Sequence, residues 1–139
     1  DPTLSYGGYM IWPLPAPWDM SWITSEYGWR IHPIYGYSLF HSGLDIAADG
    51  GTPIFAAADG RIILSEYYGG YGYCVMIDHG DGVVSLYGHM SSFAGYYSGD
   101  YVIAGDVIGY VGTTGTSTGN HLHFETRYYG DYVSPWNYL

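Results

Sequence analysis

Two of the six histidines in this 139-residue chain, His121 and His123, are separated by a single residue. In a β-strand, the side chains of residues i and i+2 lie on the same face. Both imidazoles would then point in one direction, while Leu122 and Phe124 face the core. Such a pair supplies half of a metal site, although two exposed polar residues on a half-buried strand give the same pattern.

A second candidate for metal binding is the pair His41 and Asp45, which lie four residues apart. Both side chains reach one metal ion if a turn at Gly43 aims them inward, and nitrogen with carboxylate ligation suits zinc. Taken alone this spacing is weak evidence, because a surface histidine beside an unrelated turn aspartate produces it more often. A further histidine, His89, ends the strand predicted at 83–87.

Together these motifs have the composition of a catalytic zinc site. Such a site has three protein ligands and an open position for water, whose pKa the metal lowers. A further group must take the proton from the water and stabilise the charged intermediate. His41, Asp45 and one of the paired histidines supply three ligands. The other paired histidine and His89 remain for proton transfer and charge stabilisation.

Short strands between turns are predicted to position these residues. The chain has 22 glycines and 18 tyrosines, and this enrichment favours many short strands over helices. No segment longer than about two turns keeps a 3.6-residue apolar period. A spacing of about ten residues between turn signals predicts an all-β sandwich or barrel. The strands are expected at 52–57, 61–66, 73–78, 83–87, 107–111 and 121–127.

The chain is predicted to form one domain, at residues 22–139, which is long enough to bury a core without disulfides. Residues 1–21 are proline-rich and are predicted to be a lead-in segment on the surface of the domain, held there by Trp12 and Trp18. The single cysteine, Cys74, lies in an apolar run and is expected to be a buried strand residue.

The charge of the chain restricts its partners. It has 3 basic and 13 acidic residues, a formal net charge of −10, which argues against nucleic acid or an anionic membrane. No apolar run is long enough to span a bilayer, so membrane insertion is not expected. The glycine-rich loop 112–120 lacks the lysine and the following helix of a phosphate-binding loop.

The ordered motifs of the chain resemble those of the lysostaphin/LytM-type zinc endopeptidases, also called the duplicated-hybrid-motif family. The resemblance rests on the motifs His41-x-x-x-Asp45, Tyr87-Gly-His89 and His121-Leu-His123-Phe124-Glu125. The resemblance covers about residues 22–139, with further similar stretches at 23–34, 51–56, 109–112, 116–119 and 133–139. Several ordered motifs across one span are far more specific than any one of them.

The resemblance implies a compact antiparallel β-sandwich or barrel-sandwich with an active-site groove between loops. It also implies a single zinc ion per chain, held by His41, Asp45 and His123. His89 and His121 would be catalytic, one as general base and the other orienting or stabilising the tetrahedral intermediate. The sequence leaves open which of the two histidines has which role.

Four further residues or segments have expected roles. Tyr35, six residues before His41, matches a tyrosine that helps hold the oxyanion in some members of the family. His32 and His79 are expected to have structural, hydrogen-bonded roles. The tyrosine-rich segment 67–73 is predicted to form a wall of the substrate groove, because tyrosine offers a flat apolar face with a polar tip.

The implied activity is hydrolysis of peptide bonds in bacterial peptidoglycan, in the stem peptide or the cross-bridge. The implied location is extracellular or in the cell envelope, secreted or periplasmic, with the export signal outside this sequence. We expect a monomer whose partners are peptidoglycan peptides. Two alternatives are a non-catalytic LytM-like binding or regulatory module of cell-wall hydrolases, and a carbohydrate-binding β-sandwich with a structural metal. Degenerate relatives would lack ligands, whereas this chain retains all five site residues.

Overall fold

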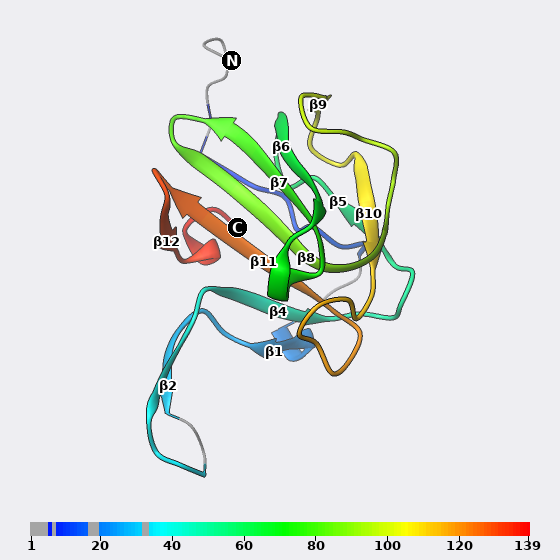
Figure 1. The fold of residues 1–139 in the computed structure, drawn as a ribbon. Coiled ribbons are helices and arrows are strands. Elements are labelled where there is room, and N and C mark those ends of the chain that lie inside the picture. The colour runs from blue at the N-terminus through cyan, green and yellow to red at the C-terminus, as the bar shows by residue number, and fades with distance from the viewer. Residues whose placement is uncertain (1–5, 7, 17–19, 32–33) are drawn as a thin grey trace.

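The computed structural model describes residues 6, 8–16, 20–31 and 34–139. Antiparallel strands dominate this part of the chain, which confirms the predicted all-β class (Figure 1). The strands are β1 (Ile23–Ser25), β2 (Gly28–Ile31), β3 (Ser38–His41), β4 (Gly43–Ala47), β5 (Pro53–Phe55), β6 (Gly60–Tyr67), β7 (Tyr73–Gly80), β8 (Val83–Phe93), β9 (Tyr101–Val102), β10 (Val107–Val111), β11 (His121–Tyr128) and β12 (Asp131–Val133). Three short 3₁₀ turns accompany them, namely η1 (Met20–Trp22), η2 (Gly69–Tyr71) and η3 (Pro135–Asn137).

One large sheet positions the candidate site. Among the described residues it has ten strands, with the main path β1-β4-β11-β8-β7-β6-β9. Strand β12 pairs with β11, and β10 pairs with both β8 and β5. Because β11 lies between β4 and β8 (Figure 1), it brings side chains from three separate motifs to one part of the sheet.

The core lies under the same three strands. Leu122 and Phe124 of β11 are fully buried, as their alternation with the histidines predicts. Leu44 of β4 and Tyr87 of β8 pack in the same apolar cluster. Cys74 of β7 is also fully buried, which confirms the expectation for the lone thiol. One face of β11 therefore anchors the sheet while the other carries polar side chains.

The predicted surface lead-in is wrong for part of its length. Met10 and Leu14 are buried in the core cluster, and the backbone N–H of Met10 donates to the backbone oxygen of Tyr138 at 3.0 Å. Trp12 does hold the segment in place, with its ring stacked on that of Trp136 at a centroid distance of 6.2 Å. Trp18 lies outside the described residues.

Two predicted local features of the site differ from the structure. The turn expected at Gly43 is instead the first residue of β4, because glycine allows this strand to lie very close to β11. An added Cβ at Gly43 would meet the backbone oxygen of Phe124 and the Cα of Glu125. His89 was expected at the end of a strand, but β8 continues past it to Phe93.

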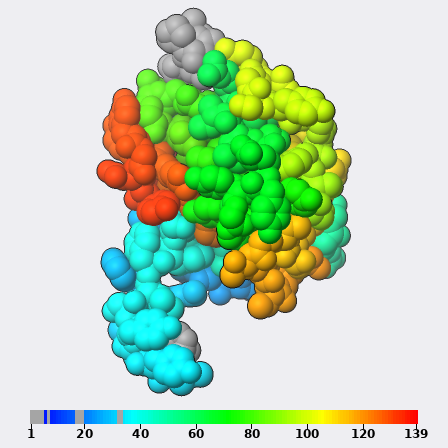
Figure 2. Space-filling model, viewed as in Figure 1, coloured from blue at the N-terminus to red at the C-terminus, as the bar shows by residue number. Residues whose placement is uncertain are grey.

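The hairpin formed by β2 and β3 projects from the main body, as Figure 2 shows in cyan. Its side chains are poorly covered, and Trp29 and Tyr35 are each 74% exposed. His41 is the last residue of β3 and lies where the hairpin joins the sheet. None of the helices in the described part of the chain is long and apolar enough to cross a membrane.

Candidate metal centre

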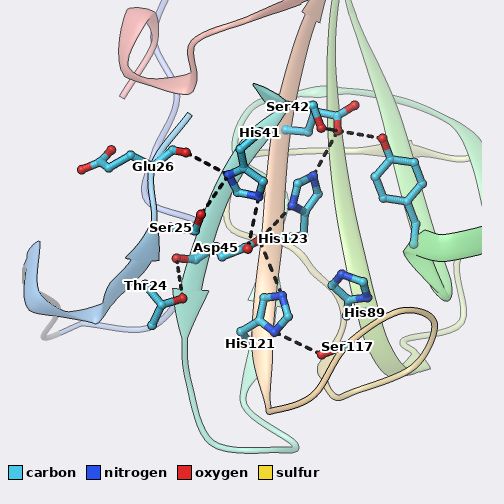
Figure 3. Close-up of polar contacts among 12 residues, drawn as sticks. Thr24, Ser25, Glu26, His41, Ser42, Asp45, His89, Ser117, His121 and His123 are labelled. Carbon is cyan, nitrogen blue, oxygen red and sulfur yellow. Dashed lines mark hydrogen bonds and ion pairs between the residues drawn. The ribbon is translucent and has the colours of Figure 1, made fainter. Parts of the chain in front are cut away.

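Three candidate ligands meet at the junction of β3, β4 and β11. In the antiparallel register of β4 and β11, His123 is directly opposite Asp45. Its Nδ1 atom lies 2.9 Å from Oδ1 of Asp45. His41, at the end of β3, places Nε2 3.1 Å from Oδ2 of the same carboxylate. The three side chains point toward one another (Figure 3).

The donor set fits a zinc ion. In the described residues, His41, Asp45 and His123 form the group whose ligand atoms all lie within 4.8 Å of one another. Zinc binds nitrogen and carboxylate oxygen at about 2.0–2.1 Å in tetrahedral geometry, so neighbouring ligand atoms are separated by about 3.3 Å. The separations of 2.9 Å between His123 and Oδ1 of Asp45, and of 3.1 Å between His41 and Oδ2, are close to this value. Two neutral nitrogens and one carboxylate are also a donor set that zinc favours.

Hydrogen bonds on the outer side orient both ligand imidazoles. The Nδ1 atom of His41 lies 2.9 Å from the backbone oxygen of Glu26. A carbonyl oxygen only accepts, so Nδ1 donates to it, and Nε2 is the atom whose lone pair would bind a metal in the neutral ring. In His123 the arrangement is reversed, because Nε2 lies 3.0 Å from Oε1 of Glu125 and Nδ1 faces Asp45.

The two predicted catalytic histidines lie beside this group. The rings of His89, from β8, and His121, from β11, have centroids 4.7 Å apart (Figure 3). Nδ1 of His89 donates to the backbone oxygen of Thr114 at 2.7 Å. Nδ1 of His121 donates to that of Gly119 at 2.9 Å. Both acceptors belong to the loop 112–120, so one loop leaves Nε2 of each neutral ring as a proton acceptor.

A β-bulge aims His89 into the site. His89 has φ of 61°, a left-handed conformation that is uncommon for a residue with a side chain. The register of β7 with β8 shifts here, from Tyr73 opposite Met90 to Val75 opposite Tyr87. The extra residue on β8 interrupts the ladder and changes the direction of one side chain, as bulges do next to active sites.

A pocket of about 540 Å³ contains all five histidine and aspartate side chains named above. Its other walls include Tyr71 and the loop residues 116–118. Within the predicted tyrosine wall, Tyr71 lines the pocket, whereas Tyr67, Tyr68 and Tyr73 are absent from its lining. Tyr35 is absent too, because it lies near the tip of the projecting hairpin.

The carboxylate of Asp45 dominates the electrostatics of the site. Burial alone would raise its pKa, but hydrogen bonds from His121, His123 and His41 hold the pKa far below the usual value. The same contacts act on the imidazoles. Burial opposes protonation of His123, yet the carboxylates of Asp45 and Glu125 raise its pKa to about 9. These groups therefore favour a positive charge at the centre of the pocket.

The two catalytic candidates have opposite shifts. Desolvation lowers the pKa of His89 below its ordinary value. The hydrogen bond between Nε2 of His121 and Asp45, 3.5 Å away, raises the pKa of His121. The two neighbouring rings therefore differ in their affinity for a proton.

Of the two histidines with expected structural roles, the structure describes only His79. His79 is 1% exposed, with Nδ1 2.7 Å from the backbone oxygen of Asp59 and Nε2 2.7 Å from Oγ of Ser85. This agrees with its expected structural role. His32 lies outside the described residues. Glu125 has no role predicted from the sequence, although the alternation of polar residues in His121 and His123 continues through it.

Comparisons with known proteins identify the family of this chain. The model of peptidase family M23 matches residues 39–135. The chain is 46% identical over 129 residues to the DD-carboxypeptidase/endopeptidase Mpg of Neisseria meningitidis, covering 93% of this chain and 29% of Mpg. It is 36% identical over 132 residues to the murein hydrolase activator EnvC of Escherichia coli, covering 95% of this chain and 29% of EnvC.

A solved structure, a zinc-containing peptidase from Vibrio cholerae, superposes with a TM-score of 0.77 at 30% identity. The match covers 88% of this chain and 37% of that one. The chain therefore belongs to peptidase family M23, which confirms the resemblance to the lysostaphin/LytM group. It spans under a third of the length of Mpg and of EnvC.

Proposed function

We propose that this domain is a zinc metalloendopeptidase that hydrolyses peptide bonds in bacterial peptidoglycan. The observation that carries the proposal is the convergence of His41, Asp45 and His123 within 4.8 Å, beside two further histidines in one pocket. His41 would bind the ion through Nε2 and His123 through Nδ1. When bound, zinc supplies a Lewis acid and lowers the pKa of water in the pocket.

The remaining steps belong to the histidines beside the metal group. His89 and His121 each donate Nδ1–H to a loop carbonyl, so Nε2 of either neutral ring is the atom that accepts a proton. One ring removes the proton from the attacking water. The other, when protonated, stabilises the negative charge that develops on the substrate oxygen. The proton taken from the water is then passed to the leaving amine.

The substrate class is supported by the relatives and by the shape of the pocket. Mpg is named as a DD-carboxypeptidase/endopeptidase, and its similarity covers 93% of this chain. The pocket is open and bordered by Tyr71 and by small residues, among them Gly70 and Ser117, which suits a short flexible peptide. Peptidoglycan lies in the cell envelope, so the domain would act there.

The direct test is digestion of purified peptidoglycan with different cross-bridges, followed by mass analysis of the released fragments. The expected result is a set of fragments with new amino and carboxyl termini at one type of peptide bond. A chelator should abolish their release, and the variant His121→Ala should slow it by about 10²–10⁴-fold. If the protein binds no zinc after its addition and releases no such fragments, the proposal is wrong.

A regulatory module is the second candidate, because the similarity to EnvC, a murein hydrolase activator, covers 95% of the chain. The two candidates differ in their dependence on His121. If the domain acts only by binding, its wild-type form and its His121→Ala variant should stimulate a partner hydrolase equally. Cleavage by the wild-type domain alone, lost in His121→Ala, excludes a purely regulatory role.

A further inference from the structure

Glu125 is a carboxylate that the metal ligands and the catalytic pair do not require, yet it is 0% exposed. Burying an ionised carboxylate is costly unless it is paired and hydrogen-bonded. Here Oε2 accepts from Nε of Arg127 at 2.7 Å. Two hydroxyl groups donate to Oε1, that of Ser42 at 2.7 Å and that of Tyr71 at 2.8 Å. The group is thus fully satisfied.

The third partner of Oε1 is the metal-binding candidate His123, with Nε2 3.0 Å away. Both residues lie on the same face of β11, two positions apart. A carboxylate without a proton only accepts, so Nε2 donates to it. Nδ1 faces Oδ1 of Asp45 at 2.9 Å, so a metal bound there would take the place of the proton between these two atoms, while Nε2 keeps its proton toward Glu125.

The same carboxylate connects the other parts of the site. Ser42 follows the ligand His41 directly in the chain. Tyr71 lines the pocket, and its ring centroid is 5.5 Å from that of His123. A buried ion pair is often no more stabilising than apolar residues of similar volume. We therefore expect the ion pair of Glu125 and Arg127 to act mainly by orienting the residues around it.

We propose that Glu125 is a positioning residue that holds His123 in the orientation and tautomer that bind the metal through Nδ1. This rests on the proposed zinc site. Partners of this kind in the outer shell fix the ring of a metal-bound histidine, and their loss typically lowers metal affinity about 10–100-fold. The carboxylate also holds the hydroxyl of Tyr71, so the same residue orients one wall of the pocket.

The test is zinc affinity, measured on the complete chain by competition with a chromophoric chelator. The variant Glu125→Met/Arg127→Met removes the ion pair as a unit and replaces it with apolar side chains of similar length. We expect its dissociation constant to rise about 10–100-fold. Arg127→Met alone keeps the contact between Glu125 and His123, and should bind zinc within about threefold of wild type.

A conservative variant separates positioning from packing. Glu125→Gln retains an oxygen that accepts from Nε2 of His123, so we expect it to restore most of the affinity lost in the double variant. Thermal unfolding of all variants without zinc reports their stability separately. Equal zinc affinity in the double variant and in wild type would overturn the proposal. Wild type that binds no zinc would instead overturn the proposed function.

A measurement on the wild type alone covers the case in which the variants do not fold. In the zinc-loaded protein, ¹⁵N correlation spectra of the imidazoles should place the proton of His123 on Nε2. A proton on Nδ1 of His123 would contradict the proposal.

Discussion

Nδ1 of His123 and Oδ1 of Asp45 lie 2.9 Å apart although 78 residues separate them in the chain. They meet because β11 and β4 pair in a register that sets these two residues opposite each other. A site built on paired strands is held more rigidly than one built on loops. The metal centre therefore depends on the sheet itself.

Removing Asp45 should separate metal binding from catalysis. Because Asp45 contacts both His41 and His123, Asp45→Ala is expected to lose zinc, with affinity at least 100-fold weaker than in wild type. His121→Ala should keep zinc and the fold but cleave peptidoglycan about 10²–10⁴-fold more slowly. Metal analysis after dialysis and fragment release measure the two effects. Zinc retained by Asp45→Ala would contradict this assignment.

Gly43 should tolerate no side chain. An added Cβ meets backbone atoms of β11 that have no room to move, so Gly43→Ala is expected to lower the free energy of unfolding by about 1–3 kcal/mol. Gly119→Ala is the matched control, because nothing lies within 4 Å of its added Cβ. Its free energy of unfolding should change by no more than about 0.5 kcal/mol. Urea denaturation compares them, and equal effects would refute the close approach of β4 and β11.

The left-handed conformation of His89 should cost stability. Glycine adopts it without strain, whereas alanine pays roughly 1–2 kcal/mol. His89→Gly is therefore expected to be more stable than His89→Ala by about 1 kcal/mol, while both lose peptidase activity. Denaturant unfolding of the two variants is the measurement. An alanine variant as stable as the glycine variant would show that the bulge relaxes when the imidazole is removed.

His79 should make the fold sensitive to acid. Burial lowers its pKa below the ordinary value of 6.5, so the native state keeps it neutral where the unfolded state takes up a proton. Its contribution to stability is therefore complete above about pH 6.5 and declines as pH falls, by at most about 1.4 kcal/mol per pH unit. An NMR titration of the His79 ring checks this directly. Titration at or above 6.5 would disprove the expectation.

Strands with strong alternation were predictable from the sequence. Residues 107–111 were predicted and β10 is Val107–Val111, while β11 extends one residue beyond the predicted 121–127. The strand β4 was missed because its initial Gly43 reads as a turn signal, and its close pairing with β11 is not a local property. Strands β1 and β2 have only three and four residues, and their pairing depends on distant partners.

The candidate site was predictable in part. Five of the six predicted site residues lie in one pocket, and Tyr35 does not, while the roles of the five remain predictions. The direction of His89 was not predictable, because the bulge depends on the register of β8 with its neighbours. Glu125 did leave a signal, since the alternation of polar residues in β11 continues from His121 to Arg127. Its contact with Tyr71, however, depends on the path of a separate turn.

The most direct test of the central claim is anomalous diffraction at the zinc edge from crystals of the zinc-loaded protein. One strong peak is expected per chain, bound by Nε2 of His41, the carboxylate of Asp45 and Nδ1 of His123. His89 and His121 should flank it without binding it. A peak bound by other residues, or no peak in crystals soaked with zinc, would contradict the account.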